Sequence, residues 1–332
     1  MDTVEFSLVV PCYNEEDVLP HFQAEVVPAL DAALGADWEI VFVDDGSRDR
    51  SRQLIVGLHL QDPRIKGVFL SRNFGHQAAV DTGLCHAKGR FVGVMDCDLQ
   101  DPVQVLLAMY AKCQSGVDVC YGVRARRDSP WLLKFFYSFF YLVMHKVATH
   151  DWPRDAGDFC VVSRKALDAV LALPENSRMF RGLRSWVGFT QLGLPYDRPK
   201  RRSGKSKYNL RKLVDLALLG FVGFTDFPLR FIGVFGFGVG LFACLLMFFV
   251  VLNRFFPQFS LFGYWVGVSP VATTILVIFL FFMSILFVFL GVIGEYIRVL
   301  LQEVKGRPFA VVDTTVGDVA RPEAPVRIKR RE

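Results

Sequence analysis

Two long uncharged segments, residues 231–252 and 271–294, limit what this chain can fold into more than any other feature of its sequence. Each is long enough to cross the apolar core of a bilayer, which takes about 20 residues as a helix. Inside lipid, a single segment can satisfy its backbone hydrogen bonds only as a helix. The sequence therefore predicts two transmembrane helices separated by a short connection.

Basic residues are distributed unequally around these two segments. A basic cluster over residues 198–212 precedes the first, Arg298, Lys305 and Arg307 follow the second, and the connection holds only Arg254. Basic loops stay on the cytosolic side, so both termini are predicted to be cytosolic in a multi-pass protein of the inner (cytoplasmic) membrane. Because the net charge of +5 is modest and its basic residues are clustered, no nucleic-acid partner is expected.

The first hundred residues alternate between strand-like and helical stretches. The strand-like runs cover residues 6–10, 38–43, 65–70 and 91–95. This alternation predicts an α/β fold with a mostly parallel sheet, which binds its ligands at the carboxyl ends of the strands. No secretory signal precedes the first strand and the seven cysteines form no C-x-x-C pair, so the thiols are expected to be reduced in the cytosol.

Two shorter apolar stretches, residues 131–147 and 207–224, favour amphipathic helices that lie in the membrane interface. Packing on the core of the domain is the alternative explanation of the same patterns. The predicted organisation is a cytosolic catalytic domain over residues 1–225, a membrane anchor over residues 226–305 and a flexible cytosolic tail over residues 306–332.

Acidic and polar residues follow the predicted strands. Asp44 and Asp45 end the second strand, and Asp96, Asp98 and Gln100 follow the fourth. Such oxygen ligands suit Mg²⁺ or Mn²⁺, which usually joins one or two protein carboxylates to substrate phosphates. Either acidic pair could instead cap the helix that follows it. Convergence of these strand ends on one edge of a sheet favours a nucleotide site.

Six motifs resemble those of the family-2 inverting glycosyltransferases with the GT-A fold. Among these, the chain is most similar to the polyprenyl-phosphate glycosyltransferases related to dolichol-phosphate mannose synthase. The motifs are VPCYNEE at 10–16, VDDGSRD at 43–49, LSRNFG at 70–75, DCDLQDP at 96–102, DAGDF at 155–159 and RRSGKSKYN at 201–209. They cover the soluble part in order, and the two-helix anchor extends the match to about residue 305.

The resemblance implies a donor site and a metal site. The residues that would hold the nucleotide are Pro11, Tyr13, Asn14, Glu15, Asp44, Asp45, Arg72 and Asp96. Asp96, Asp98 and Gln100 would bind Mg²⁺ or Mn²⁺ on the diphosphate of a nucleotide-sugar, with a UDP-sugar expected.

The resemblance also implies a site for the phosphate of a polyprenyl (undecaprenyl) lipid acceptor. Its residues would be Arg124, Lys134, Ser138, Arg201 and Lys207. Lys134 and Ser138 are one helical turn apart and share a face. Lipid headgroups or an anionic membrane surface are alternative partners for these cations.

Asp158 matches the position of the catalytic base in this family. A phosphate monoester with a second pKa of about 6 is already largely ionised at pH 7, so an orienting role is the alternative. The implied reaction is metal-dependent transfer of a sugar to polyprenyl phosphate with inversion at the anomeric carbon.

Two other functions compete with this one. A processive polysaccharide synthase shares the fold but would show a Q-x-x-R-W motif and further spans, whereas the nearest string here is RSW at 184–186. A non-catalytic membrane scaffold or lipid carrier would not need the set Asp96, Asp98, Gln100 and Asp158. Glycines at 233, 236, 238 and 240 fit close packing of the spans, either within one chain or in a homo-oligomer.

Overall fold

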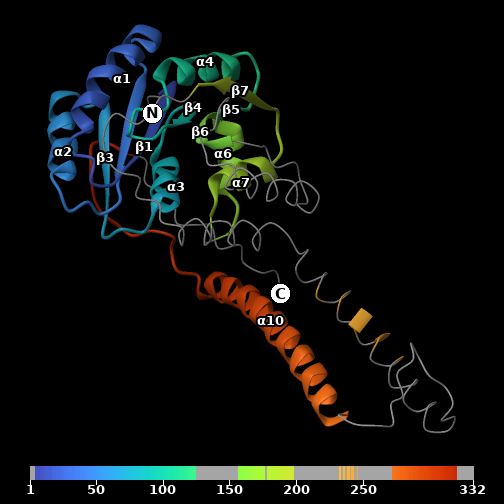
Figure 1. Ribbon diagram of the computed structural model, residues 1–332. Helices are drawn as coiled ribbons and strands as arrows, with labels where there is room; N and C mark the ends of the chain where they lie inside the picture. The colour runs from blue at the N-terminus through green and yellow to red at the C-terminus, as the bar shows by residue number, and fades with distance from the viewer. Residues whose placement is uncertain are drawn as a thin grey trace, which may run out of the picture. The chain divides into compact units, whose positions relative to one another are not determined.

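The computed structural model describes residues 4–124, 156–175, 178–197 and 271–319, with positions 232, 235, 238, 239, 241, 242 and 245 of the first apolar segment. The chain divides into two compact units (Figure 1). One comprises Met1–Val214 with Lys305–Glu332, and the other comprises Asp215–Val304. The two predicted interfacial helices, 131–147 and 207–224, lie outside the described residues.

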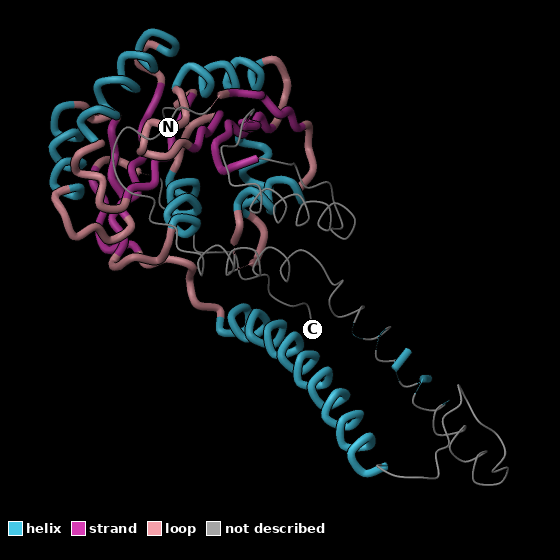
Figure 2. Tube along the Cα trace, viewed as in Figure 1, coloured by secondary structure: helices cyan, strands magenta, loops and turns pink. Residues whose placement is uncertain are grey.

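An eight-stranded sheet forms the centre of the first unit, with strand order β7-β5-β6-β4-β1-β2-β3-β8. Figures 1 and 2 show the strands lying between helices. The strands are β1 Phe6–Cys12, β2 Trp38–Asp44, β3 Ile65–Leu70, β4 Phe91–Val94, β5 Val119–Arg124, β6 Ala156–Ser163, β7 Gln191–Tyr196 and β8 Val312–Val316. Strands β4, β1, β2 and β3 are parallel neighbours, as are β5 and β7. β6 and β8 run antiparallel to the strands beside them. The predicted α/β fold with a mostly parallel sheet is confirmed.

Helices cover both faces of this sheet (Figure 1). On one face lie α1 Leu19–Leu34, α2 Ser51–Gln61 and α4 Val103–Gln114, and on the other lie α3 His76–His86, α6 Arg164–Leu171 and α7 Phe180–Trp186. The central strands are apolar at almost every position because both faces are covered.

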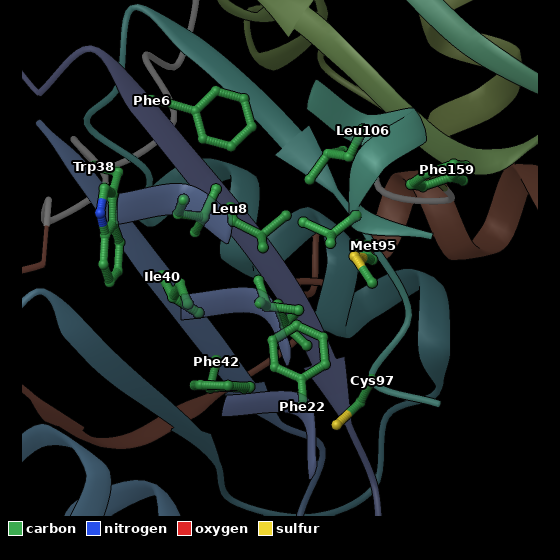
Figure 3. Close-up of a cluster of buried hydrophobic side chains, with 14 of the residues drawn as sticks. Phe6, Leu8, Phe22, Trp38, Ile40, Phe42, Met95, Cys97, Leu106 and Phe159 are labelled. Carbon is green, nitrogen blue, oxygen red and sulfur yellow. The ribbon is translucent and has the colours of Figure 1, made fainter. Parts of the chain in front are cut away.

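The main apolar core lies between the sheet and the helices α1, α2 and α4 (Figure 3). Phe6 and Leu8 of β1 face this core, and the ring of Phe22 packs on that of Phe42 with 5.5 Å between centroids. Full burial of each such side chain stabilises the fold by about 1.5–3 kcal/mol. The core therefore holds the strand ends, and the loops that follow them, in fixed positions.

The structure corrects the prediction of a flexible tail for residues 312–316, while residues 320–332 lie outside the described part of the chain. Val312–Val316 form β8, which pairs with β3 and places Thr314 opposite Phe69. Arg52 of α2 donates to the carboxylate of Asp313 at 2.9 Å and to the hydroxyl of Thr314 at 2.6 Å. The prediction rested on the prolines and basic residues of the tail. It missed β8 because the partners of this strand lie in elements more than 200 residues earlier in the chain.

The second unit contains α10, Val271–Lys305, a helix of 35 residues. It covers the second predicted transmembrane segment, and its part Phe281–Lys305 is the one helix among the described residues that is long and apolar enough to cross a membrane. Apolar side chains such as Phe279 and Phe287 are exposed along it.

The first predicted span, residues 231–252, lies mostly outside the described residues. Its described positions are all helical, and Phe235 packs edge-on against Phe289 of α10 with 5.7 Å between ring centroids. The second predicted transmembrane helix is thus present as a long apolar helix. The first is described at too few positions to establish a pair of transmembrane helices.

Candidate active site

The carboxyl ends of β1 to β4 and the beginning of β6 lie at one edge of the sheet. This follows from the antiparallel direction of β6, which pairs Val94 with Cys160. Asp96 lies two residues after Val94, just past the end of β4, and Asp158 lies two residues before Cys160, on β6. Pairing of β5 with β6 brings the end of β5, with Arg124, to the same edge.

The loops after β1 and β2 are joined by hydrogen bonds between side chains and backbone. The N–H of Asn14 donates to the hydroxyl of Ser47 at 2.8 Å, and the side-chain oxygen of Asn14 accepts from the N–H of Arg48 at 2.8 Å. The N–H of Glu15 donates to the hydroxyl of Ser51 at 2.9 Å. Pro11 is buried near the end of β1 and Tyr13 is half-buried just after it, so the four predicted donor residues lie at the end of β1 and in the braced loop that follows.

Asp44 and Asp45 are both buried, with 2% and 3% of their surface exposed. Asp44 accepts from the N–H of Ser47 at 3.2 Å. Asp45 accepts from the N–H groups of Phe74 at 2.7 Å and Gly75 at 3.0 Å. Burial raises the pKa of both carboxyls, although these donors oppose the shift. The two carboxylates therefore do hold a turn together, as the alternative to a nucleotide site predicted.

Arg72 lies in the loop after β3 that Asp45 holds. Its guanidinium stacks over the ring of Phe74 at 3.9 Å and donates to the carbonyl of Asn73 at 3.0 Å. The side chain is exposed, so it is available to a ligand at this edge.

The predicted metal residues occupy the turn that follows β4. The N–H of Gln100 donates to Asp98 Oδ1 at 3.1 Å, and Leu99 between them has a positive φ of 56°. No group of three or more His, Cys, Asp or Glu side chains suited to a metal occurs among the described residues. Two carboxylates fit Mg²⁺ or Mn²⁺, because such an ion takes further ligands from water and substrate phosphates.

Asp158 is held by the first two residues of α3, which the sequence analysis did not single out. The side-chain amide of Gln77 donates to Asp158 Oδ2 at 2.7 Å. His76 Nε2 lies 3.4 Å from the same oxygen and 3.8 Å from Asp96 Oδ1. The sequence does contain a sign of their role, because His76 and Gln77 directly follow the motif at residues 70–75.

The electrostatics of this cluster favour a charged pair. Burial opposes ionisation of His76, but its hydrogen bond to Asp158 and the charges of Asp96, Asp158 and Asp45 outweigh burial and raise its pKa to about 9. Burial also opposes ionisation of Asp158, yet His76, Arg181 and Arg184 together lower the pKa of Asp158 well below its usual range. At neutral pH an imidazolium faces a carboxylate.

Arg124 is the one predicted acceptor residue that the structure describes. It lies beside Gly157 and Tyr196, and the hydroxyl of Tyr196 donates to the buried Asp101 at 2.5 Å. Burial opposes the charge of Arg124, but Tyr196, Asp101 and Asp96 raise its pKa overall. The other four, Lys134, Ser138, Arg201 and Lys207, lie outside the described residues.

Comparison with known proteins decides the family. The family model "Glycosyl transferase family 2" matches residues 7–171. The glycosyltransferase YkcC of Bacillus subtilis (strain 168) is 36% identical over 318 residues, which cover 95% of each chain. The chain belongs to glycosyltransferase family 2. Both the family resemblance and the enzyme class predicted from the motifs are confirmed.

This family-2 glycosyltransferase is also similar to two further proteins over almost its whole length. The bactoprenol glucosyl transferase of Shigella phage SfII is 34% identical over 318 residues, covering 93% of this chain and 97% of the relative. The prophage bactoprenol glucosyl transferase homolog of Escherichia coli (strain K12) is 33% identical over 310 residues, covering 93% and 98%.

Solved structures share less with the enzyme. A mannosyltransferase from Pyrobaculum calidifontis in complex with GDP-Man and Mn²⁺ is 19% identical, covers 60% of this chain and 58% of that chain, and has a TM-score of 0.41. S. aureus TarS 1–349 in complex with UDP-GlcNAc is 18% identical, covers 67% of both chains and has a TM-score of 0.41. Similarity at this level carries no argument about ligands or function.

Proposed function

We propose that this enzyme transfers a sugar from a nucleotide-sugar, a UDP-sugar, to a polyprenyl phosphate at the cytosolic face of the membrane. One observation carries the proposal. Similarity to proteins named bactoprenol glucosyl transferase extends over 93% of the chain and so includes the apolar anchor as well as the sheet. A shared fold alone would not identify the acceptor molecule. Similarity that also includes the apolar segments favours a lipid acceptor.

The donor diphosphate is assigned to the turn that carries Asp96, Asp98 and Gln100, together with Mg²⁺ or Mn²⁺. A divalent ion bound there would neutralise the departing nucleoside diphosphate. The braced loops after β1 and β2, with Arg72 near them, would hold the nucleoside.

The reaction joins an oxygen of the acceptor phosphate to the anomeric carbon and breaks the bond from that carbon to the donor diphosphate. In-line displacement inverts the configuration. The phosphate monoester is largely ionised at pH 7 and needs little deprotonation. Asp158, with its pKa below the usual range, is a weak base, so we assign it the orientation of the acceptor.

The acceptor phosphate is assigned to Arg124, with Lys134, Ser138, Arg201 and Lys207 completing the site. In this proposal the enzyme is a multi-pass protein of the cytoplasmic membrane with both termini in the cytosol. α10 would keep the catalytic domain at the surface where the polyprenyl headgroup lies, because its exposed apolar side chains require a lipid environment.

The direct test uses the full-length purified protein, Mn²⁺, undecaprenyl phosphate and a panel of labelled nucleotide-sugars that includes UDP-glucose. The expected product is a lipid carrying one sugar. A growing polymer would instead identify a polysaccharide synthase, and the absence of turnover with every donor would favour a binding protein.

The metal assignment is tested by Asp98→Ala. This variant is expected to lose about 100-fold or more in kcat, because the leaving diphosphate loses its counter-ion. Asp168→Ala on α6 is the matched control, since Asp168 is exposed and only forms an ion pair with Arg164 at 3.6 Å. An unchanged rate in Asp98→Ala would refute the metal site.

A further inference from the structure

The carboxylate of Asp158 has two oxygens in different situations. Oδ2 accepts from Gln77 at 2.7 Å and lies 3.4 Å from His76 Nε2. Oδ1 is buried and has no hydrogen-bond partner among the residues that the structure describes. A buried acceptor left open costs free energy, so such an atom in a reaction site points to a ligand that completes it.

Gln77 is itself held from the other side. Its side-chain oxygen accepts from the N–H of Phe180, the first residue of α7, at 3.2 Å. The amide therefore has one orientation, with nitrogen toward Asp158 and oxygen toward α7. Reversing the amide would place an oxygen against a carboxylate and a nitrogen against an N–H group.

His76 joins Asp158 to the opposite side of the site. It lies between Asp158 on β6 and Asp96 after β4, at 3.4 Å and 3.8 Å. The two residues before it, Phe74 and Gly75, are fixed by Asp45. A continuous series of contacts thus runs from the loop after β2 through the start of α3 to Asp158.

We propose that His76 and Gln77 are positioning residues that tie Asp158 through Oδ2 and so direct Oδ1 toward the reacting groups. The inference rests on the proposed function and names what orients its carboxylate. Neither residue needs to touch the substrate. Misplacement of a reacting group by about 1 Å is enough to lower a rate about 100-fold.

A purely structural role would give a different result. In that case the two residues would only attach α3 to β6 and α7, and their replacement would lower stability and donor binding together. A positioning role lowers kcat while the KM for the donor and the affinity for UDP with Mn²⁺ change little.

The first experiment compares Gln77→Glu, Gln77→Met and His76→Gln in the full-length enzyme. Gln77→Glu keeps the bond to Phe180 but sets a carboxylate against Asp158, so kcat should fall about 100-fold, and about 10-fold in the other two. Donor KM and the calorimetric Kd for UDP with Mn²⁺ should stay within about threefold. His21→Gln on the exposed face of α1 is the matched control.

A second experiment follows the melting temperature beside kcat. Combining Gln77→Glu with Asp158→Asn restores a hydrogen bond in the opposite direction, so the double variant should regain the melting temperature lost in Gln77→Glu alone, without regaining kcat. Additive changes in melting temperature, or a kcat for Gln77→Glu within twofold of wild type, would overturn the inference. If neither the wild-type enzyme nor His21→Gln transferred any sugar, that result would count against the proposed function instead. The melting temperatures would still show whether Gln77 and Asp158 are hydrogen-bonded.

Discussion

Asp45 shows how a single buried carboxylate fixes the loop that leads into the candidate site. Its carboxylate binds the N–H groups of Phe74 and Gly75, and this contact sets the position of His76, the next residue. Gly46, beside it, has a φ of +66°, and a Cβ there would lie 2.5 Å from the backbone carbon of Arg72. The loops after β2 and β3 can approach this closely only because residue 46 has no side chain.

Gly46→Ala should therefore impair both stability and donor binding. The positive φ costs about 1–2 kcal/mol for any residue with a Cβ, and the clash with Arg72 also displaces the loop. Gly35→Ala is the matched control, because Gly35 has a φ of +62° with nothing within 4 Å of an added Cβ. Melting temperature should fall in both variants, and affinity for UDP should fall only in Gly46→Ala. Equal affinities would show that the close approach does not shape the donor site.

His76 gives the domain a dependence on alkaline pH. Its pKa of about 9 in the fold lies above the value of 6.5 for a free histidine. The charged contact therefore contributes fully below about pH 6.5 and is lost as the pH rises through 9. Between pH 7 and pH 10, measured with EDTA, the melting temperature of the wild type should fall more than that of His76→Gln. Identical falls would mean that His76 does not carry this charge.

Two antiparallel strands, β6 and β8, place Asp158 at the candidate site and cover one edge of the sheet. β6 runs against β4, so its first residues, including Asp158, meet the carboxyl ends of the parallel strands. β8 covers the edge of β3, and the carbonyl of Val311 just before it accepts from the N–H of Ser71 at 2.9 Å. The segment after α10 thus braces the loop that leads to Arg72 and His76.

Removing β8 should weaken the domain. A chain ending at residue 310 would leave the backbone groups of β3 unpaired at an open edge, which favours association between molecules. We expect a lower melting temperature and more aggregation than in wild type. A chain ending at residue 320 keeps β8 and should match wild type in both assays. Equal melting temperatures for the two truncations would show that β8 adds no stability.

The whole molecule consists of two units with different surfaces. The unit Met1–Val214 with Lys305–Glu332 buries its apolar side chains in a core, whereas α10 exposes large ones, among them Ile275, Phe281 and Leu290. In water such exposure promotes aggregation, whereas in lipid it costs nothing. This contrast supports a chain that works at the membrane surface.

Substitution along α10 tests this environment. Phe287→Asp places a charge near the middle of the helix, which costs about 2.5–3.5 kcal/mol at the centre of a bilayer. Val304→Asp places the same charge near the end, where water is close, and is the matched control because both side chains are exposed. The carbonate-resistant membrane fraction should fall for Phe287→Asp and stay near wild type for Val304→Asp. If both variants remained in the membrane fraction equally, α10 would not be the anchor.

By itself, the sequence determined the order of β1 to β4, the helices after β1 and β2, the long apolar helix α10 and the acidic and polar residues that follow the strands. These features depend on local periodicity and composition, which each segment carries alone. Only the tertiary structure decided that β6 runs antiparallel, that His76 and Gln77 meet Asp158, and that residues 312–316 complete the sheet. Each of these contacts joins residues about 80 or more positions apart, or depends on strand direction, and no local pattern specifies such pairings.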